Sequence, residues 1–555
     1  MARLSSQQKE QLTELFGPRV SFERVERKMY SHDIAEMPSM IKPLVGSTVP
    51  HAVVQPESEQ ELVALVKWAV QHRIPLTPRG KATSGYGGVL PIKGGIVVDF
   101  FRMDRVLDVD TEAQTATLEA GIVWELADRA LKKHGFTLLS YPSSYPSSTA
   151  GGWLAQGGAG LGSYEAGWFR DTVVSARVVQ PDGIVKEFSG ADLDLIADAE
   201  GITGIISSLT IRIQPDEELE IVSIGCSDAH GVQELLQALI DDELPIWSIH
   251  FINPRMAEMK NRAPLMQHHG HPIEERVLLP ASYIITLAFR AKDSETVQAG
   301  LQKNMKLCQA EILSDRITHH EWAHRFRIMT VKRLGPSLVP AEVVVPLEGL
   351  GDMMTEVERK IDQPVVKEGI IIRDGRGGKP EVVILGFIPA DQRKFTYNFV
   401  FPLSLTIAKI AEKHGGRPYA TGLYYTRMGD KILGKERIRK LGQYKAQVDP
   451  KGVLNPGKVI GNGLISTALI LANAFEPLLR PFGNHVIAQV GERPQKPVRD
   501  IPADVAWYAY ACSQCGYCVQ ECDQYYGRGW RARAPVASGT GSANTWKAAR
   551  IGPSL

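Results

Sequence analysis

Four cysteines lie close together near the end of the sequence, at Cys512, Cys515, Cys518 and Cys522. Their spacing, C-x-x-C-x-x-C-x-x-x-C, is that of a bacterial-ferredoxin loop, in which one tight turn directs three thiolates at three irons of a cube. Zinc and a redox dithiol are the alternatives, but structural zinc prefers two separated C-x-x-C pairs. We therefore expect these four cysteines to bind a [4Fe–4S] cluster.

The cysteine motif departs from the ferredoxin pattern in two ways. Asp523 follows the fourth cysteine, where proline is usual, and the other two cysteines, Cys226 and Cys308, are isolated. In two-cluster ferredoxins the fourth cysteine of the run binds the other cluster. No second motif is present here to complete one.

A glycine-rich loop forms a second candidate site in the first half of the chain. Residues 78–88 read Pro-Arg-Gly-Lys-Ala-Thr-Ser-Gly-Tyr-Gly-Gly and follow an expected strand. Glycine permits positive φ, so successive backbone N–H groups can converge on an anion, and Thr83 and Ser84 add hydroxyl donors. The dinucleotide fingerprint G-x-G-x-x-G is absent, so a Rossmann site is not supported. Taken alone, the loop is explained equally well as an ordinary glycine-rich turn.

Further motifs accompany this loop in a fixed order, namely Ser143–Gly152, Gly157–Gly162, Arg170-Asp171, Gln180–Gly183, Glu200–Ile206 and Asp449–Lys458. The series resembles the FAD-linked oxidases of the vanillyl-alcohol oxidase type, and within them the glycolate and D-lactate dehydrogenase branch. The resemblance covers residues 45–220 well and 415–460 less fully. Between these segments, in the expected cap region, the resemblance lies mostly in the position of the region along the chain.

The resemblance implies an α+β fold with three parts. These are a two-subdomain PCMH-type FAD-binding domain, an α+β cap domain and a short C-terminal ferredoxin-like iron–sulfur segment. It also implies that FAD is bound non-covalently, because Thr83 stands where covalent members carry histidine. The expected cofactor contacts are Pro78, Arg79, Gly80, Lys81, Ala82, Thr83, Ser84, Gly85, Ser144, Ser148, Thr149, Gly151, Gly152, Gly201, Gly204, Ile205, Ile206, Asn455 and Lys458.

One segment departs from the glycolate and lactate branch. Members of that branch usually carry an H-x-G-D-G-N-x-H segment, linked to a metal and to the carboxylate of the hydroxy acid. Here the corresponding stretch, residues 417–427, contains neither histidine nor carboxylate. We therefore expect Tyr424 and Tyr425 to handle the proton and Arg427 to bind the anion. The alternative is that the tyrosines only pack the cap against the flavin domain.

The resemblance implies a dehydrogenase that moves hydride from a small organic substrate, most closely a 2-hydroxy acid, to flavin. Electrons would leave through the cluster to an electron carrier, the quinone pool or an iron–sulfur partner protein. Two alternatives remain open. One is another enzyme of this type, acting on phenolic alcohols or in alkyl-glycerone-phosphate synthesis. The other is a non-catalytic flavin/iron–sulfur electron-transfer subunit.

The tail after residue 530 is rich in Ala, Gly and Ser and has no periodicity. Related flavin/iron–sulfur chains tend to continue with a Ser-Pro-Arg-Gly-Lys segment. A nucleotide sequence that encodes Ser-Pro-Arg-Gly-Lys-Trp-Tyr-Trp-Leu-Arg-Glu-Tyr-Met-Glu-Gly encodes Ala534–Ala548 when read one base later. We therefore expect a frameshift near Gly529–Arg533, with a second cluster motif in the original frame. Resequencing that found one intact frame through Leu555 would contradict this.

Composition bounds the class of protein. The 555 residues include 63 Lys+Arg and 62 Asp+Glu, a net charge of +1, so nothing points to nucleic acid or an anionic membrane. The best apolar run, residues 464–475, is shorter than the roughly 20 residues of a membrane span. The first 16 residues hold no apolar secretory segment. We expect a cytoplasmic protein, either free or held at a membrane through a partner.

The elements that must position these motifs follow from hydrophobic periodicity. Strands are expected at 51–54, 74–77, 95–99, 105–109, 116–120, 173–179, 209–213, 283–289 and 382–387, and helices at 5–16, 59–71, 123–134, 231–240, 294–310 and 348–361. The expected domains are an N-terminal helical segment (1–46), the FAD-binding domain (47–218), the cap or substrate domain (219–415), a C-terminal return that contacts FAD (416–460), a linker with an apolar helix at Ile465–Leu479 ended by Pro481 (461–500), the iron–sulfur motif (501–530) and an out-of-frame or disordered tail (531–555).

Two histidine motifs are discounted. His320-Glu-Trp-Ala-His324 matches the zinc-protease pattern, but no convincing third ligand follows it, and histidines on a helix surface explain it better. His268-His-Gly-His271 lies in a polar stretch and is interpreted as a solvated loop.

Overall fold

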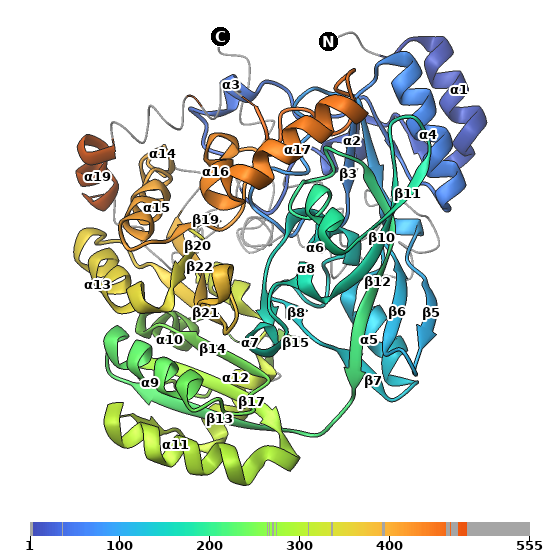
Figure 1. Cartoon of the computed structure of the whole chain (residues 1–555). Coiled ribbons are helices and arrows are strands. Elements are labelled where there is room, and N and C mark those ends of the chain that lie inside the picture. Colours follow the sequence, from blue (N-terminus) through green and yellow to red (C-terminus); the bar gives the residue numbers. More distant parts are fainter. Residues whose placement is uncertain are drawn as a thin grey trace.

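The computed structural model describes residues 4–35, 37–263, 265, 267–268, 271–272, 275–308, 310–334, 337–390, 395–461, 467 and 476–485. The cysteine motif and the expected frameshift lie outside these residues. Two parts pack against each other (Figure 1), which we call the N-terminal part (residues 6–215) and the cap (219–418). The chain then returns to the N-terminal part, where the bridge Leu76↔Leu454 joins them.

The N-terminal part contains two sheets. The smaller has the order β1-β2-β4-β3, and its pairs β2–β4 and β3–β4 are parallel. The larger is antiparallel in the order β11-β10-β12-β6-β5, and β7 also pairs with β12. The strands are β1 (Val20–Ser21), β2 (Ala52–Val54), β3 (Leu76–Arg79), β4 (Ile96–Asp99), β5 (Val106–Asp110), β6 (Thr115–Glu119), β7 (Phe136–Leu138), β8 (Tyr141–Pro142), β9 (Gly160–Leu161), β10 (Val173–Val179), β11 (Val185–Ser189) and β12 (Ile205–Pro215).

Local sequence explains where a helix of the N-terminal part begins and which face it buries, as α4 shows. In α4, Leu62, Leu65 and Val66 are fully buried on one face, and the Ser58 side chain caps the first turn by accepting from Glu61 N. The helices are α1 (Ser6–Phe16), α2 (Arg24–Met29), α3 (Lys42–Val45), α4 (Glu59–His72), α5 (Trp124–Lys132), α6 (Ala150–Gln156), α7 (Ser163–Ala166) and α8 (Phe169–Thr172).

The cap is built on one large sheet. Its order is β18-β13-β17-β14-β21-β22-β20-β23, with β19 also pairing with β22. The strands are β13 (Leu219–Cys226), β14 (Ser248–Ile252), β17 (Tyr283–Arg290), β18 (Glu311–Ile312), β19 (Ser337–Pro340), β20 (Val343–Pro346), β21 (Val366–Ile372), β22 (Glu381–Ala390) and β23 (Arg417–Pro418), and a separate hairpin pairs β15 (Gln267–His268) with β16 (His271–Pro272).

The two faces of the cap sheet have different neighbours. One face packs its apolar residues, Ile249 and Phe251 among them, against α9, α13 and α15 in a core that also includes α11 residues (Figure 1). The helices of the cap are α9 (Ala229–Asp241), α10 (Pro254–Arg262), α11 (Ser294–Cys308), α12 (Asp315–Ala323), α13 (Leu350–Lys360), α14 (Tyr397–Val400) and α15 (Leu403–Lys413). After the cap follow α16 (Gly429–Ile432), α17 (Lys435–Val448) and α19 (Glu476–His485).

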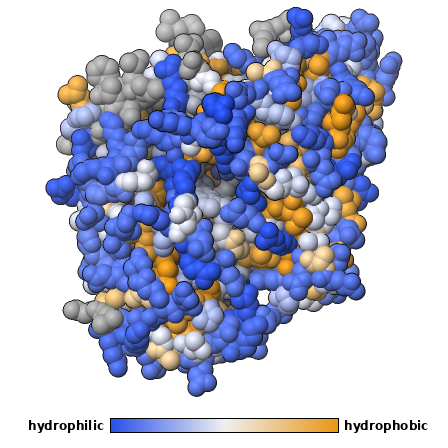
Figure 2. All heavy atoms as spheres, viewed as in Figure 1, coloured by the Kyte–Doolittle hydropathy of each residue, from blue (hydrophilic) through white to orange (hydrophobic). Residues whose placement is uncertain are grey.

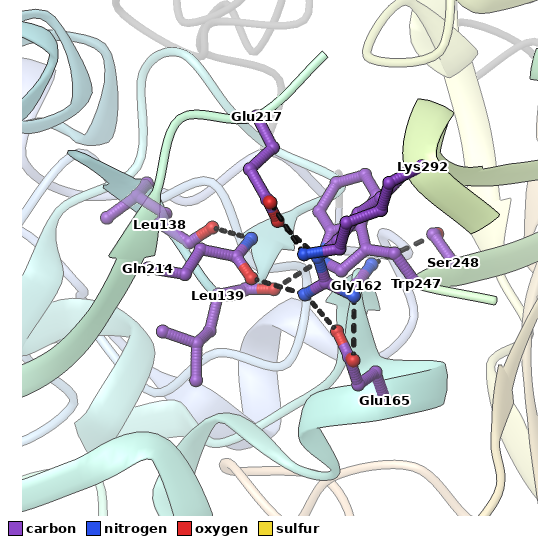
Figure 3. Close-up of polar contacts among 10 residues, drawn as sticks. Leu138, Leu139, Gly162, Glu165, Gln214, Glu217, Trp247, Ser248 and Lys292 are labelled. Carbon is purple, nitrogen blue, oxygen red and sulfur yellow. Dashed lines mark hydrogen bonds and ion pairs between the residues drawn. The ribbon is translucent and has the colours of Figure 1, made fainter. Parts of the chain in front are cut away.

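The opposite face of the cap sheet lies against the N-terminal part. Successive strand residues point to opposite faces, so Ser248 and His250 share this face. Gly162 N donates to Ser248 Oγ at 3.0 Å, and Arg290 forms two 2.9 Å bonds to Glu165 on α7 and one of 3.1 Å to Gln214 on β12. Figure 3 shows these contacts between the two parts. They fix the cap over the N-terminal part.

Most expected elements are confirmed, but the helix near residue 480 differs. The helices expected at 59–71, 231–240 and 348–361 correspond to α4, α9 and α13. Pro481 was expected to end a helix, yet α19 continues through it to His485. Tertiary contacts hold this last turn, because Gln363 Nε2 donates to Gly483 O at 2.8 Å and Asn484 Nδ2 donates to Lys360 O at 2.9 Å.

The length and hydropathy of the described helices do not match those of a membrane span. None of them is both long enough and apolar enough to cross a bilayer. The face in Figure 2 is largely hydrophilic, and its hydrophobic residues form small separate patches.

Candidate functional site

A cavity with about 890 Å³ of empty space, partly open to solvent, lies in the N-terminal part. We call it the main cavity. Three segments form its walls, namely the loop after β3, the first turn of α6 with the loop before it, and residues 200–206. Of the expected cofactor contacts, it is lined by Pro78, Arg79, Gly80, Lys81, Ala82, Thr83, Ser84, Ser144, Ser148, Thr149, Gly151, Gly152, Gly201, Ile205 and Ile206. Gly85, Gly204, Asn455 and Lys458 do not line it.

The main cavity has the features that a pyrophosphate and a flat ring system require. The buried Oγ atoms of Ser84 and Ser148 have no hydrogen-bond partner in the described structure, so they are available to an anion. Glycine lets the walls approach, because a Cβ at Gly80 would lie 2.2 Å from Thr149 Oγ1. Aromatic and aliphatic lining, including Phe100 and Trp153, suits a planar ligand. The residues present therefore fit FAD.

Asn455 and Lys458 act on the glycine-rich loop rather than on the cavity itself. Asn455 Nδ2 donates to the backbone oxygens of Gly88 at 2.9 Å and Glu200 at 2.6 Å. Lys458 Nζ donates to Leu90 O at 2.7 Å. Both side chains are buried, so the C-terminal return fixes the loop that lines the main cavity.

Three buried charged groups surround this loop. Burial raises the pKa of Glu200 to about 8 and that of Asp33 to about 6, and it lowers the pKa of Lys458 to about 7. Glu200 lines the main cavity, and its carboxyl is mostly protonated at pH 7. It therefore does not repel an anionic cofactor.

A second cavity, with about 380 Å³ of empty space, contains both tyrosines expected to be catalytic, and we call it the tyrosine cavity. Tyr424 and Tyr425 line it beside Tyr86 and Glu342, a residue that the sequence did not single out. Burial raises the pKa of Tyr425 to about 12, so this hydroxyl keeps its proton near neutral pH. Burial also raises the pKa of Glu342 to about 7. Arg427 is exposed and lines neither this cavity nor the main one.

A third cavity, with about 290 Å³ of empty space, lies on the cap-sheet face that is turned toward the N-terminal part. We call it the cap-sheet cavity. His250 on β14 and Glu368 on β21 line it, together with Lys260, Glu321, His324 and Arg325. Sequence reasoning missed His250, Glu368 and Arg325. The available signal was a polar residue inside an otherwise apolar strand, as in Ser248–Ile252.

The cavity's acidic and basic side chains are not all free to bind a ligand. Lys260 Nζ contacts both Glu321 oxygens, at 2.7 and 2.6 Å. Burial acts to raise the pKa of Glu321, but the charge of Lys260 and a hydrogen bond with His320 outweigh it and lower this pKa to about 2. The glutamate of the His-Glu-x-x-His motif is thus held in an ion pair. No group of three His, Cys, Asp or Glu residues in the described ranges could hold a metal ion.

Arg325 differs from Lys260 because no carboxylate in the described part of the chain forms an ion pair with it. Its Nη1 donates to Trp322 O at 2.6 Å, and its guanidinium lies 4.2 Å from the Trp322 ring centroid. The ring centroid of Phe326, the residue after Arg325, lies 4.6 Å from that of Tyr145. Ser144, the residue before Tyr145, lines the main cavity. Arg325 therefore lines the cap-sheet cavity with N–H groups left for a ligand, and the adjacent Phe326 contacts the loop that leads to the main cavity.

A large cavity that fits FAD in the N-terminal part, together with a cap that lines smaller cavities, is consistent with a flavin-dependent oxidoreductase of two domains. Two family models match the chain accordingly, FAD binding domain over residues 50–189 and FAD linked oxidases, C-terminal domain, over residues 216–459. The chain therefore has both domains of an FAD-linked oxidase, and it is an FAD-dependent oxidoreductase.

The matches to individual relatives have low sequence identity but cover most of the chain. Glycolate oxidase subunit GlcD of Bacillus subtilis is 25% identical over 81% of this chain and 96% of its own length. A mitochondrial D-lactate dehydrogenase [cytochrome] of Arabidopsis thaliana is 24% identical over 74% of each chain. The solved structure of an alkyldihydroxyacetonephosphate synthase covers 82% of this chain and 85% of its own, with a TM-score of 0.66 and 18% identity, a likeness of fold alone.

Proposed function

We propose that this chain is an FAD-dependent dehydrogenase acting on the CH–OH group of a small 2-hydroxy acid, of the D-lactate or glycolate type. Bound FAD supplies a two-electron acceptor for the hydride of the substrate C–H bond. The observation that supports the substrate class is Arg325, a guanidinium without a carboxylate partner among the described residues, in the cap-sheet cavity. GlcD, a glycolate oxidase subunit, and the Arabidopsis D-lactate dehydrogenase are named for substrates of the same class.

A 2-hydroxy acid needs a cation for its carboxylate, and the planar N–H fork of arginine matches a carboxylate. The sequence assigned this role to Arg427, whose side chain is exposed. The proposal therefore gives the role to Arg325, where aromatic rings exclude water from one side of the guanidinium. In such a site the charged hydrogen bond is stronger than in water.

We also propose the route by which electrons leave. A [4Fe–4S] cluster at Cys512, Cys515, Cys518 and Cys522 would pass them singly to a carrier, the quinone pool or an iron–sulfur partner protein. The support is the ferredoxin-like spacing of these cysteines.

A phenolic alcohol is the second candidate substrate, and the tyrosine cavity favours it. Its lining includes Tyr86, Phe401, Tyr424 and Tyr425 but no lysine or arginine. Glu342 is its one ionisable carboxyl. Such a cavity suits an uncharged aromatic alcohol better than an acid.

An anaerobic titration of the purified flavoprotein separates the two candidates. D-Lactate, glycolate and 4-hydroxybenzyl alcohol are added in turn while the visible flavin bands are recorded. We expect D-lactate or glycolate to bleach the bands. Bleaching by the aromatic alcohol alone would replace the first candidate with the second, and no bleaching by any of the three would contradict both.

A further inference from the structure

Two buried side chains line the cap-sheet cavity, and each has one polar atom without a hydrogen-bond partner among the described residues. His250 is 5% exposed and Glu368 is 4% exposed. Among the described residues, His250 Nδ1 and Glu368 Oε2 accept and donate no hydrogen bond. A buried polar atom left unpaired costs about 1 to 3 kcal/mol. Two such atoms in one cavity point to a ligand that pairs with both.

Strand pairing places these two side chains together. β14 and β21 are antiparallel with His250 opposite Ile370 and Ile252 opposite Glu368. His250 and Glu368 are thus diagonal neighbours on one face of the sheet, a relation that spans about 7 to 8 Å between backbones. Both side chains therefore face the same cavity.

We propose that Glu368 is the catalytic base of this enzyme and that His250 holds the substrate hydroxyl in place. The inference rests on the proposed function and names the residues that would act on the hydroxyl of the 2-hydroxy acid. The substrate O–H bond breaks, its proton goes to Glu368 Oε2, and the O–H electron pair forms the C=O bond. Bound FAD would supply the two-electron acceptor for the hydride of the adjacent C–H bond, so that the acid would lose two electrons and two hydrogens.

The surroundings of Glu368 suit a proton acceptor near neutral pH. The charged or titratable groups that line the cavity with it are His250 on β14, Lys260 on α10, Glu321 on α12, and His324 and Arg325 just after α12. Burial raises the pKa of Glu368 to about 7, against the lowering effect of the Lys260 charge and with a smaller raising effect of the Glu321 charge. Burial lowers the pKa of His250 to about 4, so its ring is neutral at pH 7. A base with this pKa can both accept and release a proton at the working pH.

The test is the anaerobic reduction rate of the FAD-loaded protein by D-lactate or glycolate, whichever bleaches it, measured between pH 5.5 and 8.5. Because the base must be ionised, the wild-type rate should rise with pH through about 7. Glu368→Gln should lower the rate about 100-fold or more and remove that rise, with little change in substrate affinity. Glu348→Gln, at a carboxyl whose side chain is 75% exposed, is the matched control and should behave as wild type.

A second readout does not depend on turnover. Infrared difference spectra of the substrate-free holoprotein at low and high pH should contain a protonated-carboxyl band that is lost near pH 7 and is missing in Glu368→Gln. A variant that keeps the wild-type rate and pH profile, or keeps this band, overturns the assignment of Glu368. Loss of the pH dependence in Glu342→Gln instead also overturns it. A wild-type flavin that neither acid reduces overturns the proposed function itself, a result distinct from these.

Discussion

The main cavity and the cap-sheet cavity differ in how the chain builds them. The main cavity is formed largely by short motifs whose backbone and glycines come close together, such as Gly80 against Thr149. The cap-sheet cavity is formed by single side chains from separate elements, His250, Arg325 and Glu368. A site built from backbone suits a cofactor that stays the same from one enzyme to another. Side chains on a sheet can instead be substituted one at a time without moving the backbone. The difference explains how one FAD-binding architecture can accept different substrates.

The largest expected effect comes from the backbone of the main cavity. A Cβ at Gly151 would lie 2.6 Å from Ala120 Cβ and 3.0 Å from its Cα, and neither atom can move away freely. Overpacking of this kind costs about 1 to 3 kcal/mol. Because Gly151 and Ala120 both line the main cavity, the displaced wall should also lower FAD affinity in Gly151→Ala, by about 100-fold where about 2.7 kcal/mol of the cost falls on binding. The measurement is the flavin-to-protein ratio during equilibrium dialysis. Gly442→Ala, where no atom lies within 4 Å, is the control, and equal flavin retention in both variants would contradict the role of the close approach.

A smaller effect is expected in the cap-sheet cavity. Arg325→Gln removes the charge proposed to hold the substrate carboxylate, and a charged hydrogen bond contributes about 1.5 to 3 kcal/mol. D-Lactate affinity should therefore fall about 10- to 100-fold while FAD content stays at the wild-type level. Arg255→Gln on the exposed face of α10 is the control. Loss of FAD along with substrate would show that the two cavities are not separable.

The smallest effect is expected where a side chain acts on the main cavity through the loop. Lys458→Met keeps the length of the side chain but removes the bond to Leu90 O. FAD affinity should fall about tenfold, in line with about 1.4 kcal/mol for one lost bond. Fluorescence titration of the apoprotein with FAD measures it, and Lys431→Met at an exposed ion pair is the control. A drop as large as that of Gly151→Ala would mean that Lys458 contacts the cofactor itself.

Most of the residues that the sequence singled out as cofactor contacts line the main cavity, because they belong to short local motifs. Each motif is a contiguous segment, so residue types and spacing indicate the loop and its donors before any folding is known. Asn455 and Lys458 were expected as direct cofactor contacts, and that role stays a prediction. In the structure their side chains donate to the backbone oxygens of Gly88 and Leu90. The distinction depends on where a buried side chain ends, which spacing does not reveal.

By itself the sequence determined the α+β class, most elements, the FAD-binding domain with its cap, and the position of the glycine-rich loop. Only the tertiary structure decided which polar side chains meet over the N-terminal part. His250 and Glu368 are far apart in the chain and come together through the pairing of β14 with β21. Arg427 stands in the expected segment but is exposed, whereas Arg325 is half-buried beside Trp322. Burial, which depends on the whole fold, sets both the pKa of a carboxyl and the availability of a charge.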